Sequence, residues 1–422
     1  MIKGTDTTII QSLTAHVLSA ISTESSRTTI TISTSSEALS QLNSPAITFV
    51  DISNNIYIAD TGNDRIVKHM TTGLVCDETD GYFRTIVDLD DGFYHYQFRV
   101  VTKSWFHTEP LPPLLLPDYD TDEQYSTMNE YEWKYDNCHL PLDEELVIYE
   151  LHVGDFSGGE NDRYTHTRGQ FKNVIEKALY LKTLGINAIE LMPVQEHPSN
   201  YCRSEKNTTW GYNPRYLFAI ESSYGTTYQM KEMIDEMHKN GIRVILDGVY
   251  NHSDCSSPLT QIDHDYWYHH NPKDRNFSWG PEWNYSFYDQ KYKIWPARNF
   301  VCDSVRYLIE EFHIDGIRFD AARQIQHFDF LRWMTQEAKK TSAALGFQKI
   351  FYTIAEFLPD EPCITNVDGP MDGCWHDSFY WCLRDCLLYD NIDIERLKNV
   401  IDCRRQGFMG VTNVVNYSGE NE

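Results

Sequence analysis

The chain has 422 residues, of which 41% are hydrophobic and 14% aromatic, so it can bury the core of one large domain and one smaller domain. Its formal net charge is −26. A field of that sign repels phosphate backbones and anionic lipid, which argues against nucleic acid and membrane surfaces as partners, whereas a neutral ligand rich in hydroxyl groups carries no such penalty.

The targeting signals of the sequence are weak. No apolar run reaches the roughly 18 residues that a membrane-spanning helix needs. Residues 9–20 are interrupted by polar side chains and do not form the apolar stretch of a secretory signal. The ten cysteines lie at irregular spacings and are interpreted as reduced thiols. We therefore expect a cytoplasmic protein.

The N-terminal region combines two kinds of sequence. Residues 1–40 are rich in Ser and Thr, a composition that predicts disorder. In residues 41–72, apolar residues alternate around turn signals, as in short antiparallel strands. The core of this stretch, Tyr57-Ile-Ala-Asp60 followed by Asn63-Asp-Arg-Ile66, resembles a single NHL repeat of a β-propeller. One repeat cannot close a propeller, so we expect a fragment; a propeller-type interaction protein is the weakest alternative function.

Residues 73–110 contain a predicted hairpin. Residues 81–100 show two aromatic-rich runs around an Asp-Asp-Gly turn. The hairpin resembles the end of the starch-binding-type β-sandwich, a carbohydrate-binding module, that precedes the barrel in branching and debranching enzymes. The alternative is a hairpin that only packs on the next domain. A Pro-containing linker is expected over residues 111–140.

From residue 141 to 422, strand-like and helical patterns alternate. Strands are expected at 146–152, 188–192, 243–246, 316–319, 351–355 and 414–417, and helices at 171–184, 230–239 and 301–312. Repeated βα units predict an α/β fold, a (β/α)8 TIM barrel with its site at the C-terminal ends of the strands. Because a closed barrel has eight strands and only six or seven can be placed, we expect the barrel to be incomplete at the C-terminus.

Three predicted strands end in polar motifs: Val244-Ile-Leu-Asp-Gly-Val-Tyr-Asn-His252, Asp315-Gly-Ile-Arg-Phe-Asp-Ala-Ala-Arg323 and Thr353-Ile-Ala-Glu356. A single acid at a strand end often only caps the following helix. In this order, however, and preceded by Trp210-Gly-Tyr-Asn-Pro214 and Ser223-Tyr-Gly-Thr226, the motifs closely resemble the α-amylase family, glycoside hydrolase family 13. The resemblance extends over about residues 75–422.

The resemblance implies that Asp320 is a nucleophile and Glu356 a general acid/base of a retaining mechanism. That chemistry needs the two carboxyl groups about 5–5.5 Å apart. Arg318 lies two residues before Asp320, so both side chains should share one face of the strand, where the guanidinium would keep the nucleophile ionised. Glu356 must begin protonated, which requires surroundings that raise its pKa.

The same resemblance implies that Tyr212, Asp247, Asn251 and His252 border the reacting sugar, with Tyr212 as an aromatic floor. The alternatives are a hydrogen-bonded loop histidine at His252 and a core aromatic at Tyr212. Asn251 matches a calcium ligand of some α-amylases, but no second acidic cluster completes an oxygen cage. We expect no metal and no cofactor.

Two positions depart from the family pattern. Arg323-Gln324 stands where relatives commonly have Lys-His, which points away from plain starch-hydrolysing amylases. The segment from Val415 aligns with one that ends in His-Asp, and Asn421 and Glu422 take those places. The resemblance makes Glu422 the third catalytic carboxylate and Asn421 its substrate-binding neighbour.

The sequence therefore predicts a retaining hydrolase or glucanotransferase of the amylase, debranching or branching type. Its partner would be an α-1,4/α-1,6 glucan such as glycogen or starch. Hydrolysis and transfer use the same groups and are not separated by sequence. The alternative is a catalytically impaired glucan-binding or vestigial protein, suggested by the Asn421-Glu422 ending and the incomplete barrel. The oligomeric state is not indicated.

Overall fold

The computed structural model describes residues 131–156, 169–198, 210–273, 278–346, 350–389 and 392–417, and the backbone of short strands between residues 31 and 99. The chain divides into two compact units. The first contains Met1–Tyr131, Pro258–Trp267 and Tyr288–Pro296; the second contains Glu132–Ser257, Tyr268–Phe287 and Ala297–Glu422. The second unit thus begins at Glu132, inside the predicted linker.

The first unit contains antiparallel strands. A five-stranded sheet has the order β2-β3-β4-β1-β7, with β1 (Thr31–Thr34), β2 (Pro45–Val50), β3 (Ile56–Asp60), β4 (Arg65–Gly73) and β7 (Phe98–Arg99). A separate pair joins β5 (Val75–Cys76) to β6 (Phe83–Arg84), and helix α6 (Pro258–Trp267) belongs to the same unit. Most of the predicted hairpin, including its Asp-Asp-Gly turn, and residues 1–30 lie outside the described residues. The likenesses to an NHL repeat and to a starch-binding sandwich stay predictions.

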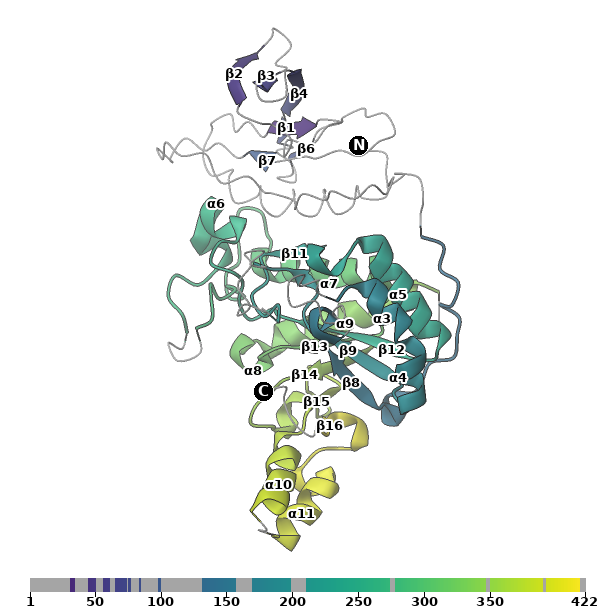
Figure 1. Cartoon of the computed structure of the whole chain (residues 1–422). Coiled ribbons are helices and arrows are strands. Elements are labelled where there is room, and N and C mark those ends of the chain that lie inside the picture. Colours follow the sequence, from purple (N-terminus) through teal and green to yellow (C-terminus); the bar gives the residue numbers. More distant parts are fainter. Residues whose placement is uncertain are drawn as a thin grey trace. The chain divides into compact units, whose positions relative to one another are not determined.

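The second unit is built on a curled sheet of seven parallel strands (Figure 1). The strands follow one another in chain order: β8 (Ile148–Leu151), β9 (Ala188–Leu191), β12 (Arg243–Gly248), β13 (Gly316–Phe319), β14 (Tyr352–Ala355), β15 (Gly373–Trp375) and β16 (Val414–Val415). The barrel-type α/β fold is therefore confirmed. Six of the strands lie where the sequence predicted them, and β15 was missed. Within the described residues, β8 and β16 form the edges of the sheet.

Helices separate the strands of this sheet: α2 (Val153–Phe156), α3 (Phe171–Glu176), α4 (Ala178–Leu184), α5 (Thr227–Lys239), α7 (Pro296–Phe312), α8 (Ala322–Ile325), α9 (Phe328–Ala344), α10 (Asp377–Leu388) and α11 (Ile394–Ile401). The connections also contain the strand pair β10 (Gln195–Glu196) and β11 (Tyr216–Ile220), and the short 3-10 helices η2 (Asp143–Glu145), η3 (Ser222–Tyr224), η5 (Pro362–Ile364), η6 (Cys403–Gln406) and η7 (Val411–Asn413). The predicted helix 171–184 is divided at Lys177 into α3 and α4.

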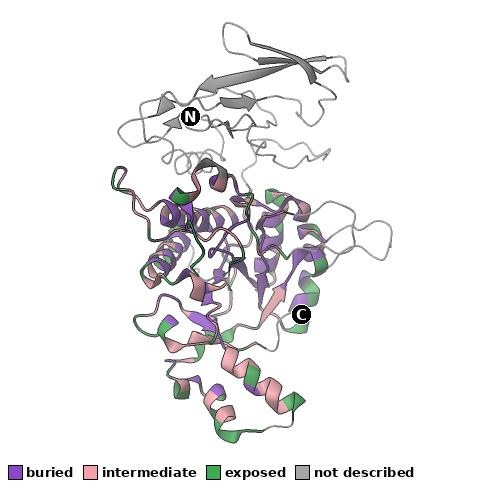
Figure 2. Ribbon diagram, turned by 90° about the vertical axis from the view of Figure 1, so that its left-hand side faces the viewer, coloured by how far each residue is buried: buried purple, intermediate pink, exposed green. Residues whose placement is uncertain are grey.

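Burial explains the sequence pattern of the sheet. Strands β9, β12, β13, β14 and β15 are buried along their whole length. Figure 2 shows the buried residues concentrated at the centre of this unit. Parallel strands that are covered on both faces read as continuous apolar runs, which is why they could be found from the sequence. The charged residues Glu190, Asp247 and Arg318 interrupt these runs.

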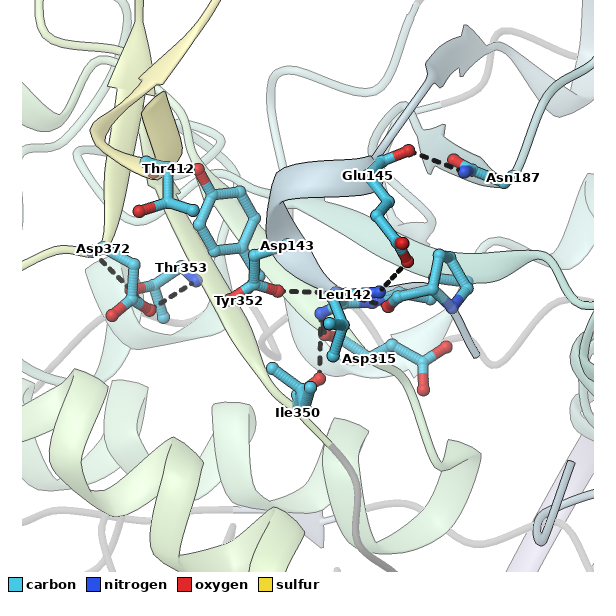
Figure 3. A network of polar contacts seen from close by, with 12 residues as sticks. Leu142, Asp143, Glu145, Asn187, Asp315, Ile350, Tyr352, Thr353, Asp372 and Thr412 are labelled. Carbon is cyan, nitrogen blue, oxygen red and sulfur yellow. Dashed lines mark hydrogen bonds and ion pairs between the residues drawn. The ribbon is translucent and has the colours of Figure 1, made fainter. Parts of the chain in front are cut away.

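A polar network closes the N-terminal end of the sheet. The buried Arg243 side chain, at the start of β12, donates to Asp143 Oδ1 at 2.6 Å, to the Asp315 carbonyl at 2.9 Å and to the Ile350 carbonyl at 2.8 Å. Figure 3 shows Asp143, Asp315 and Ile350 gathered at this end. The network joins η2 to the segments that lead into β13 and β14. In barrels of this kind, this end serves stability.

Among the helices of the described ranges, none is both long and apolar enough to cross a membrane. Cys302, Cys374, Cys382 and Cys403 are buried free thiols, and Cys382 and Cys386 share helix α10.

Candidate active site

Three neighbouring parallel strands bring the predicted catalytic residues together. Asp247 on β12 is in register with Arg318 on β13, and Arg318 is in register with Ile354 on β14. Two residues further along, Asp320 therefore lies beside Glu356. The ladder does continue to this level, because the Glu356 N–H donates to the Phe319 carbonyl at 3.0 Å. Adjacent strands lie about 4.8 Å apart, a spacing suited to two cooperating carboxyl groups.

The Arg318 guanidinium is the centre of the site. Its Nη1 donates to both Asp247 oxygens, at 2.7 and 2.9 Å, and to Asp320 Oδ1 at 2.9 Å. Its Nη2 lies 3.1 Å from Glu356 Oε2. The side chains of Arg318 and Asp247 are 2% and 0% exposed, whereas those of Asp320 and Glu356 are 14% and 18% exposed. The two carboxyl groups of the predicted reaction are thus the accessible members of this cluster.

Two aromatic rings flank the guanidinium. Arg318 lies 4.2 Å from the ring centre of Trp375 on β15 and 5.9 Å from that of Tyr212. The Tyr212 hydroxyl donates to Asp247 Oδ2 at 2.7 Å, and the residue is partly exposed. Tyr212 is therefore hydrogen-bonded within this cluster and partly exposed, and its role as an aromatic floor for a sugar stays a prediction. Trp375 was not found from the sequence, because its strand is short and contains a glycine.

The loop after β12 supplies the next two predicted residues. Asn251 Nδ2 donates to Asp320 Oδ2 at 2.9 Å, and Asn251 Oδ1 contacts His252 Nδ1. His252 is 3% exposed, and burial lowers its pKa to about 4, so the ring is neutral at physiological pH. In this geometry His252 contacts Asn251, which in turn orients the Asp320 carboxylate. A direct contact between His252 and a sugar stays a prediction.

Burial decides the protonation of the acids. It raises the pKa of Glu356, and the neighbouring charge of Asp320 raises it further, although Arg318 opposes both. This is the direction that a general acid requires. Burial also raises the pKa of Asp320; Arg318 lowers it, as expected from the sequence, but is outweighed. Arg318 therefore only partly offsets the effect of burial on the ionisation of Asp320.

The turn after Asp320 contacts the Glu356 carboxyl group. Ala321 has a left-handed backbone (φ 42°), which is uncommon for a residue with a side chain. In this conformation its N–H donates to Glu356 Oε2 at 2.7 Å. Such strain persists where the surroundings fix it and is concentrated at functional sites. Nothing in the Asp-Ala-Ala sequence signals this turn.

Glu190 and Glu150 also face the site and were missed. One carboxylate oxygen from each of Glu150, Glu190 and Asp247 lies within 4.8 Å of the others, a grouping that could in principle hold a metal ion. Both Asp247 oxygens are, however, bonded to the Arg318 cation, whose charge opposes a second cation there. An acid inside an apolar strand was the signal that could have revealed Glu190.

Of the two departures from the family pattern, the structure describes the one at Arg323 and not the one at Asn421 and Glu422. Arg323, on α8, donates to the Pro359 carbonyl at 3.0 Å and to Glu361 Oε1 at 2.7 Å. It thereby joins the segment after Asp320 to the segment after Glu356. Asn421 and Glu422 lie outside the described residues, so their predicted roles stay predictions.

Comparisons with known proteins agree with this geometry. Residues 150–353 match the family model described as "Alpha amylase, catalytic domain". Malto-oligosyltrehalose trehalohydrolase of Saccharolobus solfataricus is 34% identical over 214 residues, which cover 46% of this chain and 31% of that protein. The 1,4-alpha-glucan branching enzyme GlgB of Vibrio cholerae is 33% identical over 228 residues, which cover 54% and 29%. The chain thus spans about a third of the length of these curated relatives.

Solved structures share the fold. The pullulanase SAP of GBS, in complex with maltotetraose, aligns with a TM-score of 0.62 at 21% identity, over 93% of this chain and 53% of that one. The cyclic α-maltosyl-(1→6)-maltose hydrolase of Arthrobacter globiformis aligns with a TM-score of 0.51 at 20% identity, over 66% of each chain. The match of residues 150–353 to the α-amylase catalytic-domain model agrees with the resemblance that the motifs indicated.

Proposed function

We propose that the protein is a retaining enzyme of α-glucans, either a glycoside hydrolase or a glucanotransferase, that acts on α-1,4 or α-1,6 glucosidic bonds of glycogen or starch. The observation that carries this proposal is the single guanidinium of Arg318 in contact with the carboxyl groups of both Asp320 and Glu356. An arginine that orients two accessible carboxyls on adjacent strands suits double displacement at an anomeric carbon.

In the first step, an Asp320 oxygen attacks the anomeric carbon while Glu356 gives its proton to the leaving glycosidic oxygen. The bond to the leaving sugar breaks as the glycosyl ester forms. In the second step, Glu356, now ionised, takes a proton from water or from a sugar hydroxyl, whose oxygen displaces Asp320. Water gives hydrolysis and a sugar hydroxyl gives transfer.

The surrounding residues support this division of work. The Asn251 amide fixes one oxygen of Asp320 and Arg318 fixes the other, so the nucleophile is oriented before substrate arrives. The Ala321 N–H and Arg318 both contact Glu356 Oε2. The curated relatives named above are a trehalohydrolase and a branching enzyme, which supports an α-glucan as the substrate class.

The experiment is an assay of the purified protein on glycogen, amylose and pullulan. New reducing ends report hydrolysis, and a changed distribution of branch lengths without new reducing ends reports transfer. Asp320→Asn and Glu356→Gln are the matched variants, because each keeps the shape of the side chain and removes its ionisable group. The proposal fails if the wild-type protein changes none of these glucans, and glucan binding without turnover would favour the impaired or vestigial alternative.

A further inference from the structure

A second layer of acids lies beside the catalytic centre and has no part in the mechanism above. Glu190 on β9 is 2% exposed, and it is in register with Glu150 on the neighbouring strand β8. Carboxylate oxygens of Glu150, Glu190 and Asp247 lie within 4.8 Å of one another. Glu190 is thus a buried carboxyl group beside a half-buried one, and burying a carboxyl group is unfavourable unless it interacts with a neighbour.

That neighbour is Arg318. Its Nη1 and Nη2 are used by Asp247, Asp320 and Glu356, which leaves the Nε side of the guanidinium. Glu190 Oε1 lies 4.0 Å from Arg318 Nε, and neither atom has a hydrogen bond within the described part of the chain. Glu190 thus lies beside the Nε edge of the guanidinium and makes no hydrogen bond with it.

Burial and the neighbouring acids favour a neutral Glu190. Arg318, Asp247, Glu150 and Glu356 are the ionisable groups that act on it, one base against three acids. Burial and these acids raise the pKa of Glu190 to about 8, so the carboxyl group keeps its proton at pH 7. An ionised Glu190 would compete with Asp320 and Glu356 for Arg318, and its charge would raise the pKa of Glu356 in turn.

We propose that Glu190 is a positioning residue of the catalytic centre, which as a neutral carboxyl group bounds the Nε edge of Arg318 and leaves the guanidinium charge to Asp320 and Glu356. The role rests on the proposed function, since it acts through the two groups that would carry the reaction.

Two neutral replacements separate this role from simple packing. Glu190→Gln keeps the shape and a polar group, whereas Glu190→Met keeps a similar volume without a polar group. On glycogen at pH 6, we expect kcat of Glu190→Gln to stay within about 3-fold of wild type. We expect Glu190→Met to lose about 10- to 100-fold in kcat with KM changed less than about 3-fold, because the buried Arg318 Nε would then face an apolar side chain. Equal losses in both variants, or wild-type turnover by Glu190→Met, would overturn the proposal.

A second measurement does not depend on activity. The unfolded-state pKa of Glu190 is near 4.5 and the folded-state pKa is about 8, so between these pH values only the folded state holds the proton, and stability falls as pH rises. Glu190→Gln removes that loss. Its Tm relative to wild type should therefore rise between pH 5 and pH 8, by on the order of 5 °C.

The control is Glu196→Gln on β10. Glu196 is half-buried, and desolvation raises its pKa to about 7, but the groups that act on it are Glu221, Ser222 and Arg215. The Tm of Glu196→Gln relative to wild type should also rise with pH. The kcat of this variant should equal that of wild type. If the wild-type protein turns over no glucan, the proposed function fails, and the Tm series still decides: a difference that does not change with pH overturns the neutral Glu190.

Discussion

Replacing Arg318 by lysine tests the centre of the site most sharply. Lysine keeps the positive charge and the flexible stem but has a single nitrogen, so it cannot reproduce the two-nitrogen contact with Asp247, Asp320 and Glu356. The contact with Glu356, made by Nη2, is the one we expect to be lost. A hydrogen bond to a charged group contributes about 1.5–3 kcal/mol, which corresponds to a fall in kcat of about 10- to 150-fold.

The pH profile should change as well. Arg318 lowers the pKa of Glu356, so losing this contact raises that pKa further. Glu356 then stays protonated to higher pH, and the alkaline limb of kcat/KM should move upward in Arg318→Lys. The assay is kcat/KM on maltooligosaccharides from pH 4 to pH 10.

Arg243→Lys is the matched control, because Arg243 is equally buried but lies at the N-terminal start of β12, at the other end of the sheet. Arg243→Lys should lose the hydrogen bonds to the Asp315 and Ile350 carbonyls, which should lower the free energy of unfolding by about 1–3 kcal/mol. The kcat of the folded variant should stay nearly unchanged. Wild-type kcat and pH profile in Arg318→Lys, or equal loss of kcat in both variants, would refute this reasoning.

Three further changes probe neighbouring groups. Tyr212→Phe removes the hydroxyl that donates to Asp247 at 2.7 Å and should lower the free energy of unfolding by about 1–3 kcal/mol in urea titration; an unchanged midpoint would contradict it. His252 has a folded-state pKa of about 4 against 6.5 unfolded, so its contribution to stability is lost as pH falls through that window. His252→Gln should therefore lose less stability than wild type between pH 6.5 and pH 4, by up to about 3 kcal/mol. Parallel curves of unfolding free energy against pH for the two proteins would exclude this. At Gly280, an added Cβ would lie 2.2 Å from the Ser253 carbonyl, so Gly280→Ala should destabilise by about 1–3 kcal/mol, whereas a wild-type Tm would show that the loop can yield.

Much of the fold could be predicted because its strands are buried on both faces. Continuous apolar runs located β9, β12, β13 and β14, and the polar residues that follow them located the site. Strand β15 could not be found, because three residues with one glycine carry no periodicity. The division of the helix at Lys177 was also not signalled by the pattern of apolar residues.

Most residues that the sequence singled out lie together in the structure, whereas Glu190 and Trp375 beside them were not predicted. Arg318 and Asp320 could be placed on one face from their spacing, and the structure brings them to 2.9 Å. Glu190, Trp375 and the left-handed turn at Ala321 depend on which strands are neighbours and on local backbone conformation. Short-range sequence patterns do not encode either property. Burial likewise depends on the folded structure, and it outweighs Arg318 in setting the pKa of Asp320.

The most direct test of the account is to trap the glycosyl-enzyme. In Glu356→Gln, α-maltosyl fluoride should still react, because fluoride leaves without a proton, but the second step lacks its base. We expect an adduct of one maltosyl group on the peptide that contains Asp320, detected by mass spectrometry, and no adduct when Asp320→Asn is added. An adduct on another residue, or wild-type turnover by Asp320→Asn, would contradict the central claim that Asp320 is the nucleophile.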